Sequence, residues 1–119
     1  MKINKYAPYA SSYERDYAKH LQLRKLAGEI RDWKLEPSRF LIGFDCRYKP
    51  DFQVVMNDGT IEFHEVKGFM RDDANVKLKT AATTFPLHPF ILVTWDKATG
   101  WKLKRIKTVT PHEESNENR

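Results

Sequence analysis

The stretch that decides the fold is residues 48–68, which read YKPDFQVVMNDGTIEFHEVKG. Two strand-like runs, Asp51 to Met56 and Ile61 to Val66, flank the trio Asn57-Asp58-Gly59. Such a trio between alternating runs is typical of the loop of a β-hairpin. If the loop has three residues, Gly59 takes the left-handed conformation and Met56 faces Thr60 across the hairpin.

This register has a consequence for three charged residues. Counting back from the loop, Asp51 lies opposite Glu65. Side chains alternate along a strand, so Glu65 and Lys67 share the sheet face of Asp51. A loop of two residues would shift the register by one and put Asp51 and Glu65 on opposite faces. The prediction of an acidic site at the open end of the hairpin therefore depends on the turn.

Two neighbouring carboxylates repel each other unless a cation lies between them. Hard oxygen ligands suit Mg²⁺ or Mn²⁺, which keeps several waters and binds one or two carboxylates together with a substrate phosphate. A lysine beside such a site can hold the attacking water or stabilise charge on a phosphate. The alternative is a hairpin that carries an exposed Asp51 and an ordinary surface pair of Glu65 and Lys67.

The motif Pro50-Asp51, followed after thirteen residues by Glu65-Val66-Lys67, resembles the signature of the PD-(D/E)XK nuclease superfamily. The chain is most similar to small phage-encoded nucleases of that superfamily, including Holliday-junction resolvases. Three further segments carry this likeness: Ser11 to Glu14, Ala27 to Ile30, and Val66 to Phe69. The resemblance covers about residues 11–95. It implies an α/β fold with a restriction-endonuclease-like core, in which helices flank a mixed central β-sheet.

The resemblance also implies roles for single residues. Asp51 and Glu65 would be ligands of Mg²⁺ (or Mn²⁺), and the backbone carbonyl of Val66 would complete the metal shell. Lys67 would be the catalytic lysine. Glu14 matches the acidic residue on a helix that joins the catalytic and metal site in many members.

Glu14 has two interpretations from the residues alone. Ser11, with Glu14 three positions later, fits a capping box at a helix start. However, Glu14 also begins the apolar stripe that continues with Tyr17, Ala18 and Leu21, where a charge is costly unless it is paired or bound to metal. Both interpretations hold if the helix start borders the site.

The other elements follow from local patterns. The expected order is a helix from Ser11 or Ser12 to Ala27, a strand at 29–36, a short apolar run at 39–44, the hairpin, a helix from Asp72 or Asp73 to Phe85, a strand at 90–95 and a basic strand at 101–107. The strand–helix–strand order predicts that strand 90–95 runs parallel to strand 61–66. We expect strand 101–107 to lie at an edge of the sheet.

At 119 residues, with 40% apolar residues, the chain is expected to form one globular domain. We divide it into an N-terminal arm (1–10), the nuclease domain (11–107) and an acidic, disordered tail (108–119). No apolar run is long enough for a membrane span, and the N-terminus lacks the apolar core of a signal peptide. The single Cys46 excludes an internal disulfide, which favours a cytoplasmic location.

The positive charge follows the Lys67 motif. The whole chain has a net charge of +5, and residues 67–107 hold nine Lys or Arg and three Asp, a net charge of +6. A basic half of this kind favours a polyanionic partner such as DNA. The candidate DNA-binding residues are Lys77, Lys79, Lys102, Lys104 and Arg105. The alternatives are solvated lysines on the helix and edge-strand lysines that prevent aggregation.

These observations predict a metal-dependent DNA endonuclease that hydrolyses phosphodiester bonds, with branched or junction DNA in phage recombination, repair or genome processing as its structure-specific substrate. Resolution of a symmetric junction needs two active sites, so that role would imply a homodimer. The alternative is a nucleic-acid-binding module without catalysis, which would use only the basic half of the chain. Metal dependence separates these two functions.

Overall fold

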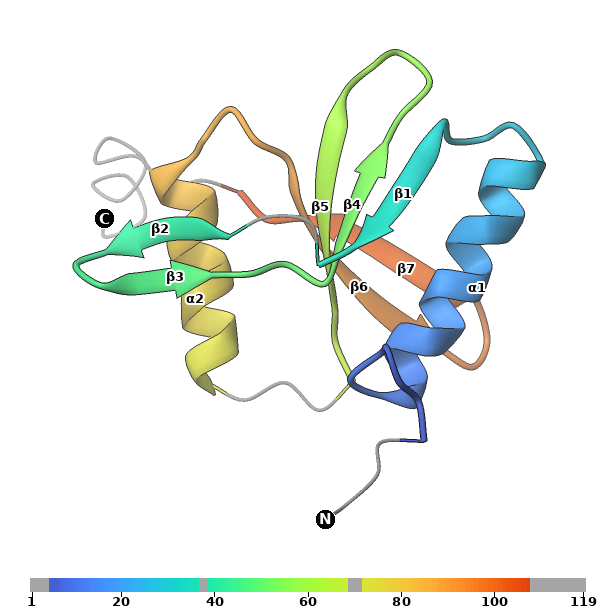
Figure 1. The fold of residues 1–119 in the computed structure, drawn as a ribbon, viewed down its shortest axis with the longest axis horizontal. Helices are drawn as coiled ribbons and strands as arrows, with labels where there is room; N and C mark the ends of the chain where they lie inside the picture. Colours follow the sequence, from blue (N-terminus) through green and yellow to red (C-terminus); the bar gives the residue numbers. More distant parts are fainter. Residues whose placement is uncertain (1–4, 37–38, 69–71, 108–119) are drawn as a thin grey trace.

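The computed structural model describes residues 5–36, 39–68 and 72–107. The elements, in chain order, are α1 (Ser12–Leu26), β1 (Asp32–Leu35), β2 (Phe40–Gly43), β3 (Cys46–Tyr48), β4 (Phe52–Val55), β5 (Ile61–Val66), α2 (Asp72–Thr84), β6 (Phe90–Asp96) and β7 (Gly100–Arg105) (Figure 1).

Five strands form one sheet in the order β1-β4-β5-β6-β7. The central pair, β5 and β6, is parallel, and every other pair in this sheet is antiparallel. Helix α2 makes the crossover that a parallel pair requires. The predicted α/β fold with a mixed central sheet flanked by helices is therefore confirmed, and it is compatible with a restriction-endonuclease-like core. The edge position predicted for the basic last strand is also confirmed.

The β4–β5 hairpin has the predicted three-residue loop. The Met56 N–H donates to the Thr60 carbonyl at 2.8 Å, and Gly59 has φ +92° in the left-handed region. The strand register continues from this pair and places Asp51 opposite Glu65. Both carboxylates therefore lie on one sheet face, at the open end of the hairpin.

The two helices cover opposite faces of the sheet (Figure 1). The core beneath α1 consists of Tyr17, Ala18, Leu21, Ile30, Phe52, Val54, Val66, Ile91 and Val93. The core beneath α2 consists of Tyr48, Phe63, Leu78, Ala81, Ala82 and Phe90. Each large apolar side chain buried in these layers contributes about 1.5–3 kcal/mol to the stability of the fold.

The predicted strand at 29–36 is wrong in its start, because β1 begins only at Asp32. The Glu29 N–H donates to the Arg24 carbonyl at 2.9 Å, so this residue still belongs to the end of α1. Ile30 is buried in the core from the bend that follows. Ile30 therefore fits the alternation of apolar residues at 29–36 because it packs in the core, although it does not pair within a strand. Pro37, the residue directly after the predicted strand, lies outside the described residues.

A second, two-stranded sheet was not predicted. The run at 39–44 forms β2, but β2 pairs with β3 through a tight turn at Phe44 and Asp45. Asp45 adopts φ +52°, a conformation more common for glycine. The left-handed residue of this turn is thus an aspartate, whereas the β4–β5 hairpin has a glycine there, so the sequence did not predict this second hairpin.

The helix predicted from Asp72 or Asp73 is confirmed as α2, whereas the loop at 69–71 and the tail at 108–119 lie outside the described residues. From the N-terminal arm, the ring of Tyr9 lies 6.5 Å from that of Phe52. Neither described helix is long and apolar enough to cross a membrane.

The Gly59→Ala variant tests the turn. A side chain at φ +92° is strained, so we expect the free energy of unfolding to fall by about 1 kcal/mol, measured by urea denaturation. Gly43→Ala is the matched control, because the added Cβ would meet only the Cys46 Cβ at an ordinary 3.9 Å. Equal losses in both variants would contradict the assigned turn geometry.

Candidate active site

Three carboxylic acids converge where the start of α1 meets the open end of the β4–β5 hairpin. Asp51 directly precedes β4, Glu65 lies opposite it in β5, and Glu14 lies in the first turn of α1. Each of the three influences the ionisation of another member of the set. The structure thus brings together three of the four predicted catalytic side chains.

Asp51 is fixed by the backbone of the neighbouring strand. Its Oδ2 accepts a hydrogen bond from the Val66 N–H at 2.8 Å. Burial and the negative charge of Glu65 raise the pKa of Asp51 to about 7, although the Val66 hydrogen bond opposes this shift. The side chain of Val66 is buried in the α1 core, so the backbone at this position is held firmly.

Glu65 is oriented by Tyr48, which was not among the predicted site residues. The buried Tyr48 hydroxyl, at the end of β3, donates to Oε2 of Glu65 at 2.9 Å. Burial raises the pKa of Tyr48, so its phenol remains a donor near neutral pH. Burial also raises the pKa of Glu65 to about 7, and the bond from Tyr48 opposes this shift. In the sequence, the position of Tyr48 just before Pro50-Asp51 is the only feature that could have indicated this role.

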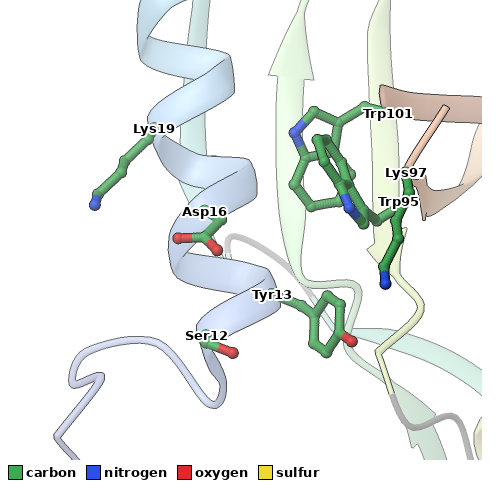
Figure 2. Close-up of a pocket in the computed structure, with 7 residues that line it drawn as sticks. All are labelled: Ser12, Tyr13, Asp16, Lys19, Trp95, Lys97 and Trp101. Carbon is green, nitrogen blue, oxygen red and sulfur yellow. The ribbon is translucent and has the colours of Figure 1, made fainter. Parts of the chain in front are cut away.

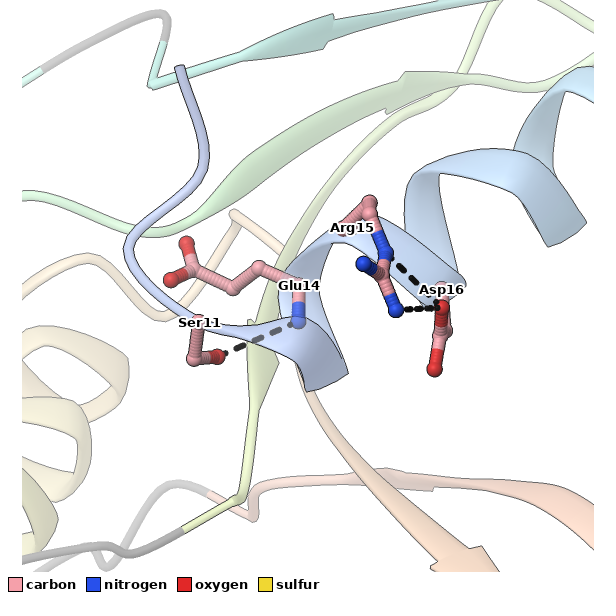
Figure 3. A network of polar contacts seen from close by, with 4 residues as sticks. All are labelled: Ser11, Glu14, Arg15 and Asp16. Carbon is pink, nitrogen blue, oxygen red and sulfur yellow. Dashed lines mark hydrogen bonds and ion pairs between the residues drawn. The ribbon is translucent and has the colours of Figure 1, made fainter. Parts of the chain in front are cut away.

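Glu14 lies in the capped first turn of α1 and also interacts with Asp51. Its backbone N–H donates to the Ser11 Oγ at 3.3 Å, so Ser11 caps α1 as expected. The Glu14 side chain is only 5% exposed and extends away from Arg15 and Asp16, which pair with each other (Figure 3). Burial, followed by the charge of Asp51 and hydrogen bonding with it, raises the pKa of Glu14 to about 8.

The three acids therefore compete for protons near neutral pH. Burial is the largest cause of each raised pKa, because a carboxylate loses its hydration when it leaves water. Mutual repulsion adds to it, so the set holds its protons jointly and not residue by residue. A divalent cation could replace those protons. Groups with such shifts in one place are typical of functional sites.

The donor chemistry of this set fits a hard divalent cation. The buried Oε1 of Glu14 has no hydrogen-bond partner among the described residues, which is costly for a carboxylate unless a cation satisfies it. Carboxylate oxygens are the ligands that Mg²⁺ and Mn²⁺ prefer. Among residues 5–36, 39–68 and 72–107, however, no three His, Cys, Asp or Glu side chains already stand in a metal-binding arrangement. The role of the Val66 carbonyl remains a prediction.

Lys67 follows directly after β5 on the same sheet face as Glu65. Its backbone N–H donates to the Val93 carbonyl of β6 at 2.7 Å, while its side chain is exposed. In the described part of the chain the Lys67 ammonium forms no ion pair. An exposed ammonium, unpaired among the described residues, thus directly follows the strand that carries Glu65.

Three of the five predicted DNA-binding residues lie together. Lys79 of α2 and Lys104 and Arg105 of β7 line a pocket of about 390 Å³, with Thr83, Ile106 and Lys107 as the other lining residues. Lys77 does not line this pocket, and the Lys102 ammonium pairs with Asp96 at 3.2 Å.

Lys104 of this basic pocket lies on the same sheet face as Glu65. In the register, Lys104 pairs with Leu92, and Leu92 pairs with Glu65. Two strand spacings separate the backbones of Glu65 and Lys104, about 10 Å. A single polyanionic strand could therefore contact both regions.

The opposite face of β5 carries a polar network that the sequence did not indicate. His64 is fully buried, with Nδ1 at 2.6 Å from the Tyr17 hydroxyl and Nε2 at 2.9 Å from Oε1 of Glu62. Burial lowers the pKa of His64, so the ring is neutral near pH 7 and one nitrogen donates while the other accepts. This network fastens α1 to β5 and so fixes the helix that carries Glu14.

A family model described as "Protein of unknown function (DUF1064)" matches residues 2–98. The match includes all three acids and Lys67, and it ends before β7. Because it covers most of the chain, the chain belongs to this family. No curated protein matches the sequence.

Stability should depend on pH through these acids. Their raised pKa values mean that the folded protein binds protons more tightly than the unfolded chain, so the stability they contribute is lost as pH rises from about 4 through 7 and 8. With chelator present, Glu14→Gln should increase the free energy of unfolding at pH 8.5 by about 1–3 kcal/mol. At pH 5 the increase should be small.

The measurement is urea denaturation at both pH values. Glu29→Gln is the control, because this exposed carboxylate pairs with Arg24 at the far end of α1. A loss of stability in Glu14→Gln that is equal at pH 5 and pH 8.5 would contradict the shared proton site.

Proposed function

We propose that this member of the DUF1064 family is a divalent-metal-dependent deoxyribonuclease that hydrolyses phosphodiester bonds as an endonuclease. The observation that carries the proposal is the convergence of Glu14, Asp51 and Glu65. Their pKa values are raised to between about 7 and 8, and the buried Oε1 of Glu14 has no hydrogen-bond partner in the part of the chain that the structure describes. The exposed Lys67 completes the arrangement two residues after Glu65.

Asp51 and Glu65 would hold Mg²⁺ (or Mn²⁺), with Glu14 and the backbone carbonyl of Val66 completing the set. The bound cation would polarise the phosphate and lower the pKa of a water. The Tyr48 hydroxyl holds one oxygen of Glu65, and the Val66 N–H holds one oxygen of Asp51. Both carboxylates are therefore fixed before the substrate binds. Such preorganisation reduces the rearrangement that the transition state requires.

Lys67 would orient the attacking water or stabilise the negative charge that develops on the phosphate. Its exposed side chain follows the strand that carries Glu65 and has no carboxylate partner among the described residues. A free ammonium can approach a substrate phosphate without first breaking an ion pair, which favours a role in catalysis.

The basic pocket supports DNA as the substrate. Lys79, Lys104 and Arg105 present three positive charges on α2 and β7. Charges of this kind bind the phosphate backbone without reading sequence. We therefore favour substrates recognised by structure, such as branched or junction DNA. Symmetric cutting of a junction would require a homodimer, which sedimentation in the presence of junction DNA tests directly.

The second candidate is a nucleic-acid-binding module without catalysis. The separate basic pocket favours it, because that pocket could hold a phosphate backbone without the acids. Such a module would bind DNA in chelator as well as in Mg²⁺, and Lys67→Ala would change little beyond a small loss of affinity.

The decisive experiment measures cleavage of linear duplex, single-stranded and four-way-junction DNA in Mg²⁺, in Mn²⁺ and in chelator. Lys67→Ala should lower the cleavage rate by at least about 100-fold, since it removes charge stabilisation in the transition state. Asp51→Asn should have a similar effect. Neither activity nor folding should change in Lys25→Ala, a control at the opposite end of α1 whose ammonium pairs with Asp32.

Circular dichroism and thermal melts establish that each variant is folded. Cleavage that persists in chelator, or that survives in Lys67→Ala, would contradict the proposal. Tight binding without any cleavage, insensitive to metal, would favour the binding module.

The basic pocket makes a separate prediction about salt. Lys104→Ala should weaken DNA binding and reduce the slope of log affinity against log salt concentration by about 1, because one phosphate contact is lost. Lys102→Ala is the matched control on the same strand, since its ammonium is already paired with Asp96 at 3.2 Å. Fluorescence anisotropy at several salt concentrations gives both slopes. Equal changes of this slope in Lys104→Ala and Lys102→Ala would contradict a specific role of the basic pocket in binding phosphate.

A further inference from the structure

A second pocket, of about 600 Å³, opens between the start of α1 and the β6–β7 hairpin. Its lining residues are Ser12, Tyr13, Asp16, Lys19, Trp95, Lys97 and Trp101 (Figure 2). Pockets of this volume hold small organic ligands. None of these side chains belongs to the acidic site or to the basic pocket.

The pocket exposes aromatic surface that is rigidly supported. Trp95 is 51% exposed and Tyr13 is 45% exposed. The ring of Trp95 meets that of Trp101 edge-on at 5.0 Å, and Trp101 meets the buried Tyr17 edge-on at 5.1 Å. These edge-on ring contacts thus connect the exposed Trp95 to the core. Exposed aromatic rings held in this way are suited to binding a planar partner.

The pocket lies close to the backbone segments that carry Glu14 and Lys67. Tyr13 is the neighbour of Glu14, and its ring lies so close to Gly68 that a Cβ added there would stand 2.8 Å from the Tyr13 Cδ2. Gly68 follows Lys67 directly. On the other side, Trp95 lies two residues after Val93, whose carbonyl accepts the Lys67 N–H. A molecule bound in the pocket would therefore lie beside Lys67.

The charges around the pocket favour an anion. Figure 2 shows the Lys97 ammonium on the same side of the pocket as Tyr13 and the two tryptophans. Lys97 forms no ion pair in the described part of the chain, whereas Asp16 is paired with Arg15 at 3.1 Å. Aromatic faces next to a free cation suit a ligand that combines a planar ring with a phosphate.

We propose that this pocket binds an unpaired nucleobase of the DNA, stacked on Trp95 and Tyr13, with Lys97 at the adjoining phosphate. This inference rests on the proposed function, because it assumes a DNA substrate at Lys67. Bases inside a duplex have both faces covered by their neighbours, and only an unpaired base can offer a face to a protein ring. The pocket thus selects DNA with unpaired nucleotides near the cutting site, such as single strands, flaps and open junctions.

The experiment measures binding in chelator, so that no cleavage takes place. Fluorescence anisotropy gives the affinities for a single-stranded oligonucleotide and for a blunt duplex of the same length. Trp95→Ala should weaken single-strand binding about tenfold and duplex binding less than about twofold. Trp95→Phe keeps a ring and should restore most of the affinity. A 2-aminopurine base in the single strand should be quenched by the wild type and far less by Trp95→Ala.

Phe44→Ala is the matched control, because Phe44 is a fully exposed aromatic residue at the β2–β3 turn, outside the pocket. Thermal melts and circular dichroism identify variants that do not fold, and Trp95→Phe provides a second test if Trp95→Ala is unstable. Equal loss for single strand and duplex, or an effect no larger than that of Phe44→Ala, would overturn the proposal. So would a Trp95→Phe variant that binds single strands as weakly as Trp95→Ala.

The outcomes separate the two proposals. If the Trp95 variants lose only single-strand binding while no cleavage that requires metal and Lys67 is found, the stacking site stands and the nuclease assignment fails. If cleavage requires Lys67 and metal but Trp95→Ala binds single strands normally, the nuclease assignment stands and the stacking site fails.

Discussion

Burying Asp51, Glu65 and Glu14 close to one another is energetically costly, and the rest of the structure has to offset this cost. Carboxylates so close to one another are stable only if they share protons or a cation. The fold holds them there through bonds to Asp51 and Glu65 from the Val66 N–H and the Tyr48 hydroxyl. The rest of the molecule supplies the stability that offsets this cost, chiefly through the two apolar layers.

The parallel pairing of β5 and β6 connects the three regions discussed above. It places the end of β5, with Lys67, beside the segment of β6 that leads to Trp95. The antiparallel β7 then brings Lys104 onto the face of Glu65. The acidic set, the exposed Lys67, the basic pocket and the aromatic pocket thus all lie on or next to strands β5, β6 and β7, an arrangement suited to the polyanionic substrate proposed above.

The α1 helix packs on the sheet and also carries a residue of the acidic site, and the pattern of residues along the helix could not distinguish these two functions. Its apolar face packs on the sheet through Tyr17, and the network of Tyr17, His64 and Glu62 fastens it to β5. Its first turn carries the capping bond of Ser11 and the buried carboxyl of Glu14. Because the cap uses the backbone N–H, the side chain of Glu14 remains free to enter the acidic site.

The sequence by itself determined the features that depend on near neighbours: the hairpin with Gly59 at its turn, the shared face of Asp51, Glu65 and Lys67, and the buried stripe of α1. Turn chemistry and side-chain periodicity are local rules, so these features follow from the order of residues. Only the tertiary structure decided that Tyr48 would orient Glu65, that Glu14 would reach Asp51 and that Tyr13 would face Trp95. These contacts join elements far apart in the chain, and the raised pKa values arise from burial, which exists only once the layers have packed.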